Sequence, residues 1–147
     1  MIRINRRKLI TTSAVLAIAA LTVTTVPAQA LNPNMGTDPG VTASTIKLGI
    51  TSPLTGIAAP GYSKIPGAMK AYFDYVNANG GVNGRKITLV SKDDQYIPTT
   101  AVAKANELIL RDKVFALVGT LGTASTKALT SSTQLSKRGI PSLFVNT

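Results

Sequence analysis

The sequence of 147 residues contains no cysteine, no histidine and no tryptophan, and it has only six acidic residues. Without cysteine, a disulfide framework, a thiol nucleophile and a lipid-modified cysteine are all excluded. Because histidine is missing as well, neither the usual zinc sites nor a Ser-His-Asp triad can be assembled from this chain. These absences favour a binding protein over an enzyme, and they predict no metal and no cofactor.

Positive charge is the feature that the chain has in excess. Sixteen Lys and Arg residues against six Asp and Glu residues give a formal net charge of +10. Four of the cations lie within the first eight residues, which leaves twelve cations against six acids, a net charge of +6. These twelve occur singly or in pairs, and no aromatic residues are interleaved with them as a stacking platform for nucleic acid requires. We therefore predict a solvated surface and no nucleic-acid partner.

The first thirty residues have the layout of a cleavable export signal. Basic residues precede an apolar stretch that is unbroken over 14–21, and the sequence PAQA (27–30) then provides a small-x-small site. We predict a signal peptide over 1–30, cleavage after Ala30, and an exported, periplasmic or extracellular protein. The apolar part is too short and too rich in threonine for a transmembrane anchor. The pair Arg6-Arg7 fits the twin-arginine route as well as the general secretory route.

Short apolar strands alternate with helical periods from residue 46 onward, after a stretch rich in Pro, Gly, Asn and Thr that predicts a flexible linker over 31–45. The order β-α-β-α-β-α-β, with right-handed crossovers, predicts an α/β fold with a doubly wound parallel sheet. Because the sequence stops as its last strand begins, we expect this sheet to be incomplete. The predicted strands are 46–51, 86–91, 115–119 and 141–145, and the predicted helices are 65–79, 98–112 and 124–138.

The turn after the third predicted strand, GTLGTAST (119–126), is the strongest candidate for a binding site. Ligands of parallel sheets bind at the carboxyl ends of the strands. The glycines allow close approach, and the N–H groups at the start of the following helix favour a carboxylate or a phosphate. Alternatively, Thr123 or Ser125 caps the helix, and the two roles are compatible. Nucleotide-binding motifs are excluded because the glycine spacing does not fit them.

The acidic residues do not form a catalytic pair. Asp93 and Asp94 follow a predicted strand, and adjacent strand residues point to opposite faces. We predict that these two carboxylates make loop hydrogen bonds or cap the next helix. The other acids are predicted to be solvated, and they are Asp38, Asp74, Glu107 and Asp112.

Six motifs occur here in a characteristic order and spacing. They are VTASTIKLG (41–49), SPLTG (52–56), Gly67-Ala68-x-x-Ala71, VNANGGVNGRKI (76–87), Asp93-Asp94, and Val118-Gly119 before the Thr/Ser turn. In this order they resemble the amino-terminal lobe of periplasmic substrate-binding proteins that serve branched-chain amino-acid ABC importers. The resemblance covers nearly all of 40–147.

The resemblance implies that 46–147 is the amino-terminal part of a type I periplasmic-binding-protein lobe, without its second lobe and hinge. It implies a solute-binding component that holds a branched-chain or related amino acid, or an amide, and that works with a membrane permease. The ligand's α-carboxylate would contact the turn after the third strand, where Thr123 takes the position of the usual contacting serine. The loop 54–62 would flank the cleft. The implied ligand-binding residues are Thr123, Ala124, Ser125 and Thr126.

Three other interpretations remain open from the sequence. The same architecture occurs in the extracellular ligand-sensing lobe of a receptor, and the chain is alternatively a non-functional truncated copy of a binding protein. An exported enzyme on this fold is disfavoured because the chain offers no nucleophile–base pair. The absence of cysteine favours a soluble exported form over a lipid-anchored one.

Overall fold

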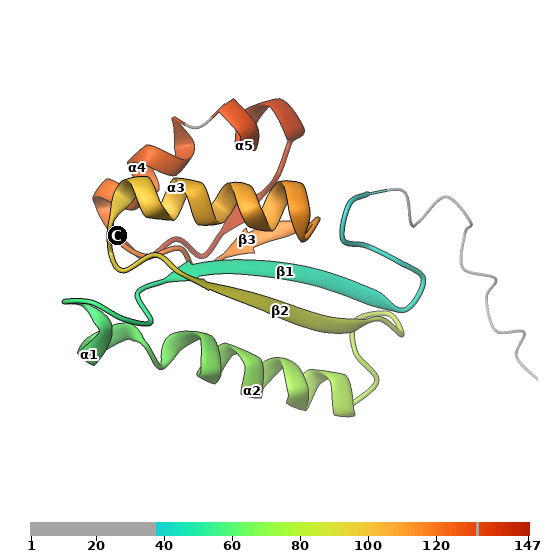
Figure 1. Cartoon of the computed structure of the whole chain (residues 1–147). Helices are drawn as coiled ribbons and strands as arrows, with labels where there is room; N and C mark the ends of the chain where they lie inside the picture. The colour runs from blue at the N-terminus through green and yellow to red at the C-terminus, as the bar shows by residue number, and fades with distance from the viewer. Residues whose placement is uncertain (1–37, 132) are drawn as a thin grey trace, which may run out of the picture.

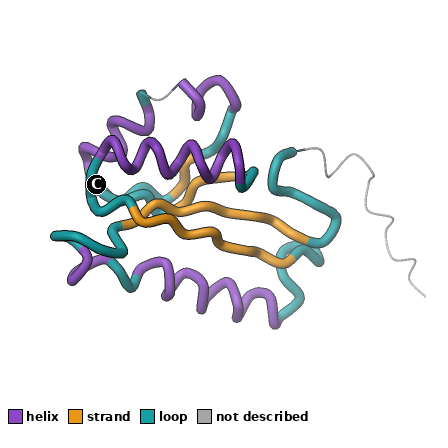
Figure 2. The backbone as a smooth tube through the Cα atoms, in the orientation of Figure 1, coloured by secondary structure: helices purple, strands orange, loops and turns teal. Residues whose placement is uncertain are grey.

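A computed structural model describes residues 38–131 and 133–147, and the predicted signal peptide lies outside these residues. Within them, four parallel strands form one sheet, and helices lie against both of its faces (Figure 1, Figure 2). The predicted doubly wound α/β sheet is therefore confirmed. The elements are β1 (Thr45–Ser52), α1 (Ala59–Tyr62), α2 (Ile65–Ala78), β2 (Lys86–Asp93), α3 (Pro98–Asn106), η1 (Glu107–Arg111), β3 (Ala116–Val118), α4 (Thr123–Thr130), α5 (Thr133–Arg138) and β4 (Ser142–Leu143).

Strand β1 lies inside the sheet, whose strand order is β2-β1-β3-β4. It pairs along its whole length with β2, from Thr45 opposite Lys86 to Ser52 opposite Asp93, and with β3 on its other side. The chain thus extends the sheet first on one side of β1 and then on the other. This reversal places the switch point, where ligands of such sheets bind, between the carboxyl ends of β1 and β3.

The hydrophobic core lies mainly on the face of the sheet that α3, α4 and α5 cover, opposite α2 (Figure 1). Strand β3 is fully buried, as its continuous apolar sequence predicts. Side chains from α3, η1 and β3 meet there with others from α4 and α5. The buried cluster consists of Ala105, Leu108, Ile109, Val114, Leu117, Leu129 and Leu135.

The NGGVNGR stretch lies in the connection from α2 to β2. In the structure its residues fix the conformation of this turn. The Asn77 side chain donates to the Ile87 carbonyl (2.8 Å) and accepts from the Ile87 N–H (2.7 Å), which fixes the end of α2 to β2. A Cβ at Gly81 would lie 2.2 Å from the Arg85 carbonyl oxygen, so only glycine fits. Arg85 is 7% exposed, and its Nε donates to the Thr42 carbonyl (2.9 Å). The prediction that every cation lies on a solvated surface is therefore wrong at Arg85.

The helix predicted over 98–112 is present, but its last turn is wider than an α-helix. Helix α3 continues directly into the π-helical segment η1, which ends where the Asp112 N–H donates to the Glu107 carbonyl (3.0 Å). The periodic apolar positions Ala105, Leu108 and Ile109 are buried, as the helical spacing predicts.

The single helix predicted over 124–138 is wrong, because α4 ends at Thr130 and α5 begins at Thr133. The hydroxyl groups of Thr130 and Ser131 both donate to the Lys127 carbonyl, at 3.0 and 2.9 Å. The Ser131 N–H donates to the same carbonyl (3.1 Å), so the hydroxyl groups add to the last helical hydrogen bond and do not replace it. Hydroxyl side chains that bond back to the preceding turn weaken a helix slightly, in agreement with the end of α4 at this point.

Candidate functional site

Three loops meet at the carboxyl edge of the sheet, and Asp93 holds two of them together. Its Oδ1 accepts hydrogen bonds from the N–H groups of Leu54 (2.9 Å) and Thr55 (3.2 Å) in the loop after β1, and from that of Gln95 (3.0 Å) in the loop after β2. The Thr55 hydroxyl donates to its other oxygen. Asp94 Oδ1 accepts from the Tyr96 N–H (2.9 Å). The predicted loop hydrogen bonding of both aspartates is confirmed.

The two adjacent carboxyls have opposite electrostatic environments. Partial burial acts to raise the pKa of Asp93, but the hydroxyl and the three N–H donors outweigh it, so the pKa lies below its usual value. Asp94 is 0% exposed, and burial raises its pKa even though the Tyr96 N–H donor opposes the shift. The Thr51 hydroxyl lies close enough to help stabilise the Asp94 carboxylate, but it does not reach hydrogen-bond geometry. Asp93 is therefore the aspartate whose ionised form the surroundings favour more, and it joins the loops after β1 and β2.

The third loop leads into α4, whose first turn is uncapped within the described part of the chain. The N-cap residue is Gly122, with φ 95° and ψ 130°, and no side chain satisfies the helix start. The first helical hydrogen bond runs from the Thr126 N–H to the Gly122 carbonyl (2.8 Å), so the N–H groups of Thr123, Ala124 and Ser125 precede it. The possibility that Thr123 or Ser125 caps the helix is wrong. Free N–H groups in this position attract an anion.

The four predicted ligand residues occupy the first turn of α4, but they are not equally accessible. Thr123 and Ala124 are exposed, Thr126 is partly buried, and Ser125 is 3% exposed. A bound anion can therefore reach the Thr123 hydroxyl and the backbone of this turn, whereas the Ser125 side chain lies in the protein interior. Their role as ligand contacts stays a prediction.

Buried hydroxyl groups lie under this edge, and the sequence analysis did not single them out. Thr51, Ser52 and Thr120 are each 1% exposed, and their hydroxyl oxygens have no hydrogen-bond partner in the described residues. All three lie at or just beyond the carboxyl end of β1 or β3, on either side of the switch point. Their sequence signal is a polar residue directly after the apolar part of a buried strand.

The last residues of the chain brace the same turn. The Gly122 N–H donates to the Asn146 carbonyl (2.8 Å), and the Asn146 N–H donates to the Thr120 carbonyl (2.9 Å). The C-terminus consequently lies at the end of the sheet where α3 begins (Figure 1). Asn146 therefore holds the turn through two backbone hydrogen bonds.

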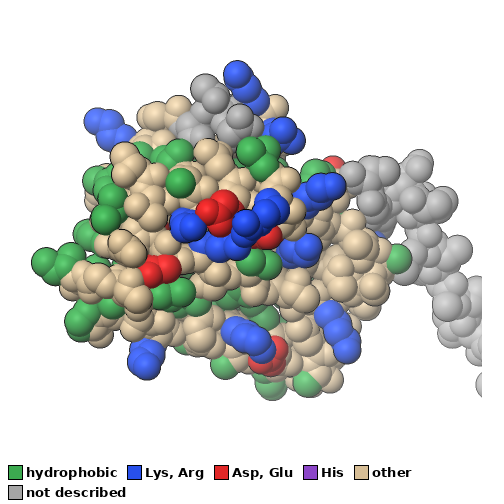
Figure 3. Space-filling model, viewed as in Figure 1, with side chains coloured by type: hydrophobic (Ala, Val, Ile, Leu, Met, Phe, Trp, Pro, Cys, Tyr) green, Lys and Arg blue, Asp and Glu red, His purple; other side chains and the backbone are tan. Residues whose placement is uncertain are grey.

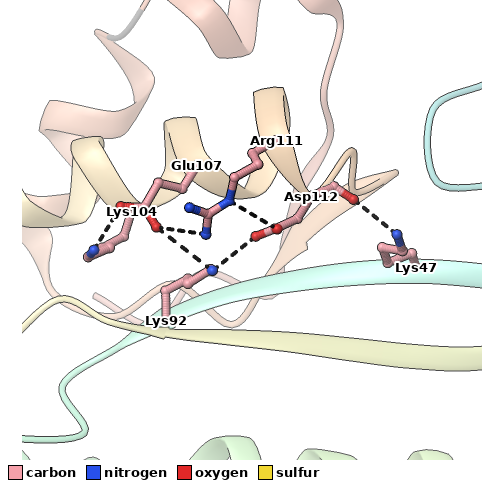
Figure 4. A network of polar contacts seen from close by, with 6 residues as sticks. All are labelled: Lys47, Lys92, Lys104, Glu107, Arg111 and Asp112. Carbon is pink, nitrogen blue, oxygen red and sulfur yellow. Dashed lines mark hydrogen bonds and ion pairs between the residues drawn. The ribbon is translucent and has the colours of Figure 1, made fainter.

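A separate network of charges lies along α3 and η1, away from the α4 turn (Figure 4). Lys92 on β2 pairs with Asp112 (3.1 Å), and Glu107 pairs with Lys104 (2.7 Å) and Arg111 (3.3 Å). On this face of the molecule, blue and red side chains gather over α3 (Figure 3). Glu107 and Asp112 are thus paired and partly buried, so the prediction that they are simply solvated is wrong.

Neither a metal site nor a membrane helix is found in the described part of the chain. Residues 38–131 and 133–147 contain no group of three or more His, Cys, Asp or Glu side chains placed to hold a metal ion. No helix in these residues has the length and apolar character needed to cross a bilayer.

A match to the sequence profile of one protein family covers most of the chain and shows which family it belongs to. The profile of the periplasmic binding proteins matches residues 45–147, which is more than half of the chain and includes every strand and helix described above. The chain belongs to this family. Periplasmic binding proteins are substrate-binding proteins and not enzymes, and the sheet observed here resembles their type I lobe, as the sequence predicts.

Relatives of this periplasmic binding protein carry related names. It is 44% identical over 82 residues to an amino acid binding protein from Pseudomonas aeruginosa, a match that covers 55% of this chain and 22% of that protein. A branched-chain amino acid transporter substrate binding protein from Streptococcus pneumoniae, solved in complex with isoleucine, is 26% identical with a TM-score of 0.63, over 71% of this chain and 34% of that one.

A third relative is named for a different class of ligand. The fatty acid ABC transporter substrate-binding protein from Thermomonospora curvata is 36% identical with a TM-score of 0.61, over 71% of this chain and 26% of that one. The matches therefore span only between 22% and 34% of the length of these three relatives. Amino acids and fatty acids differ in size and polarity, but both carry a carboxylate.

Proposed function

We propose that this chain supplies the carboxylate-binding lobe of an exported solute-binding protein, and that the protein delivers a branched-chain or related amino acid to the permease of an ABC importer. The single observation that carries the proposal is the uncapped first turn of α4 at the switch point of the sheet. Three N–H groups and the exposed Thr123 hydroxyl are available there. Hydrogen bonds from such donors to a charged group are stronger than those to a neutral one.

The family and the named ligands of its relatives support this assignment. The matched proteins are named for amino acids, a branched-chain amino acid and a fatty acid, and the carboxylate is the group that these ligands share. The donors that the structure places at this turn are backbone N–H groups and the exposed Thr123 hydroxyl. Membership of the family and the predicted signal peptide support export, and the word transporter in the names of two relatives supports a permease partner.

The test is calorimetric titration of the purified protein with L-leucine and with L-leucinamide, which lacks the carboxylate. We expect L-leucine to bind and L-leucinamide to bind at least tenfold more weakly. The change Thr123→Ala should weaken L-leucine binding by roughly 10- to 100-fold, since a hydrogen bond to a charged group contributes about 1.5–3 kcal/mol.

The matched control is Thr88→Ala, which removes an exposed threonine from β2 and should leave the affinity unchanged. If the amide bound as tightly as the acid, the site would not be a carboxylate site. If Thr123→Ala behaved like Thr88→Ala, the hydroxyl of Thr123 would have no part in binding.

A further inference from the structure

The loop between β2 and α3 holds two consecutive residues in a strained backbone conformation. Gln95 has φ 56° and Tyr96 has φ 64°, both in the left-handed region. For residues other than glycine this conformation costs about 1–2 kcal/mol each. Such strain persists only where the surrounding contacts enforce it, and it concentrates at binding and catalytic sites.

The two adjacent aspartates enforce this conformation. Asp93 Oδ1 accepts from the Gln95 N–H (3.0 Å), and Asp94 Oδ1 accepts from the Tyr96 N–H (2.9 Å), so each carboxylate holds the N–H two residues further on. The loop closes where the Ile97 N–H donates to the Asp94 carbonyl (2.9 Å). Hydrogen bonds of this kind are typical of aspartates at turns. The Asp-Asp pair therefore holds the backbone from which the Tyr96 side chain projects.

The Tyr96 ring lies directly against Gly122, the N-cap residue of α4. A Cβ at Gly122 would approach Tyr96 Cε2 to 2.8 Å and the Tyr96 hydroxyl oxygen to 3.3 Å. Any larger residue at 122 would displace the ring, and the φ of 95° at this position favours glycine as well. The large Tyr96 side chain thus packs against a glycine, although the two residues lie 26 positions apart in the sequence.

The ring is not buried by this contact, because 43% of Tyr96 remains exposed. The ring packs on Gly122, which directly precedes the free N–H groups of the α4 turn. An apolar surface thus adjoins an anion-binding turn.

We propose that Tyr96 is a further ligand-binding residue, which provides the apolar wall next to the carboxylate of the bound acid. The inference rests on the proposed carboxylate site and adds the class of ligand that it takes: an organic acid with a non-polar group close to its carboxylate, which packs against the exposed part of the ring. Aromatic side chains suit this role because they bury a large area at a small entropic cost.

The experiment compares Tyr96→Ala, Tyr96→Phe and Tyr75→Ala in calorimetric titrations with L-leucine. Removing the ring should weaken binding about five- to tenfold, whereas Tyr96→Phe keeps the ring and should bind within about twofold of the wild type. The control Tyr75→Ala removes a tyrosine of α2 that is 67% exposed, and it should not change the affinity.

A spectroscopic readout separates contact with the ligand from a structural role. The chain has no tryptophan, so its emission comes from tyrosine. If Tyr96 contacts the ligand, saturating L-leucine should change the emission of the wild type, and this change should be reduced in Tyr96→Phe, which still binds. An undiminished change in Tyr96→Phe, or wild-type affinity in Tyr96→Ala, would overturn the inference while the carboxylate site stands. Absence of L-leucine binding to the wild type itself would overturn both.

Discussion

The two faces of the sheet are packed very differently. On the face covered by α3, η1, α4 and α5, apolar side chains form a closed cluster in which Leu108, Val114 and Leu117 are each 0% exposed. On the other face, α2 has Pro66 as its one buried residue, and a groove of about 480 Å³ lies between this helix and the sheet. The groove is lined by Leu48, Ala68, Met69, Tyr72, Phe73, Val118, Leu143 and Phe144.

This difference indicates where the free energy of folding comes from. Apolar area contributes to stability only when it is removed from water, so the closed face carries most of the hydrophobic stabilisation of the described residues. Both faces end at the edge that holds the α4 turn and Tyr96. We expect truncation of the buried leucines of the closed face to destabilise the protein strongly, and substitution of the exposed side chains of α2 to have little effect.

The largest effect is expected for Leu108→Ala at the centre of the closed cluster. Truncating a fully buried leucine removes its transfer free energy and leaves a cavity, which together cost about 2–5 kcal/mol. The neighbouring Leu110 is 44% exposed, so Leu110→Ala should cost less than about 1 kcal/mol and serves as the control. Urea unfolding followed by circular dichroism measures both. Equal losses for the two variants would contradict the assignment of the core to this face.

The sequence was sufficient to predict these two faces only in part. Alternation and helical spacing place all four strands and the apolar positions of α3, because those features depend on residues close together in the chain. The break after Thr130 and the wide turn η1 were missed. The first involves hydrogen bonds of hydroxyl side chains to the backbone, and the second is a change of helix type. The spacing of apolar residues reports neither.

The candidate site shows the same division. The glycines and hydroxyl residues of 119–126 predict a binding turn, since strand, turn and helix follow each other directly. The contact between Tyr96 and Gly122 was not predictable, because it requires two left-handed residues and the meeting of two separate loops. The ion pair of Asp112 with Lys92 was missed for a similar reason, since 20 residues separate the partners in the chain. The signal available for Tyr96 is the Asp-Asp pair just before it.

The second prediction concerns the charge network of the closed face and its dependence on pH. Burial acts to raise the pKa of Asp112, but Lys92 and Arg111 outweigh it, so the pKa is lowered in the folded protein. Since the folded value lies below the unfolded one, the carboxylate stabilises the protein above the unfolded pKa of about 4. This stabilisation is lost as the pH falls through the folded pKa.

The change Asp112→Asn should therefore cost up to about 1 kcal/mol at pH 7, in the range measured for surface ion pairs. The difference from the wild type should shrink below about pH 4 and vanish when the wild-type carboxyl is protonated. Thermal unfolding of both proteins between pH 7 and pH 2.5 measures it. A difference that persists unchanged at the lowest pH would show that the side chain acts through packing and not through its charge.

The smallest effect is expected on the α2 face, for Tyr72→Asn. Tyr72 is 65% exposed, and its ring meets that of Phe73 at a centroid distance of 6.4 Å, a tilted pair at the rim of the groove. Because most of the ring is already in water, its loss removes little buried area and should change the free energy of unfolding by less than about 0.5 kcal/mol. A destabilisation of 2 kcal/mol or more would mean that the groove is covered in the folded protein in solution. Both faces of the sheet would then be covered, one by a cluster of helices and the other by a further segment of the protein or by a partner.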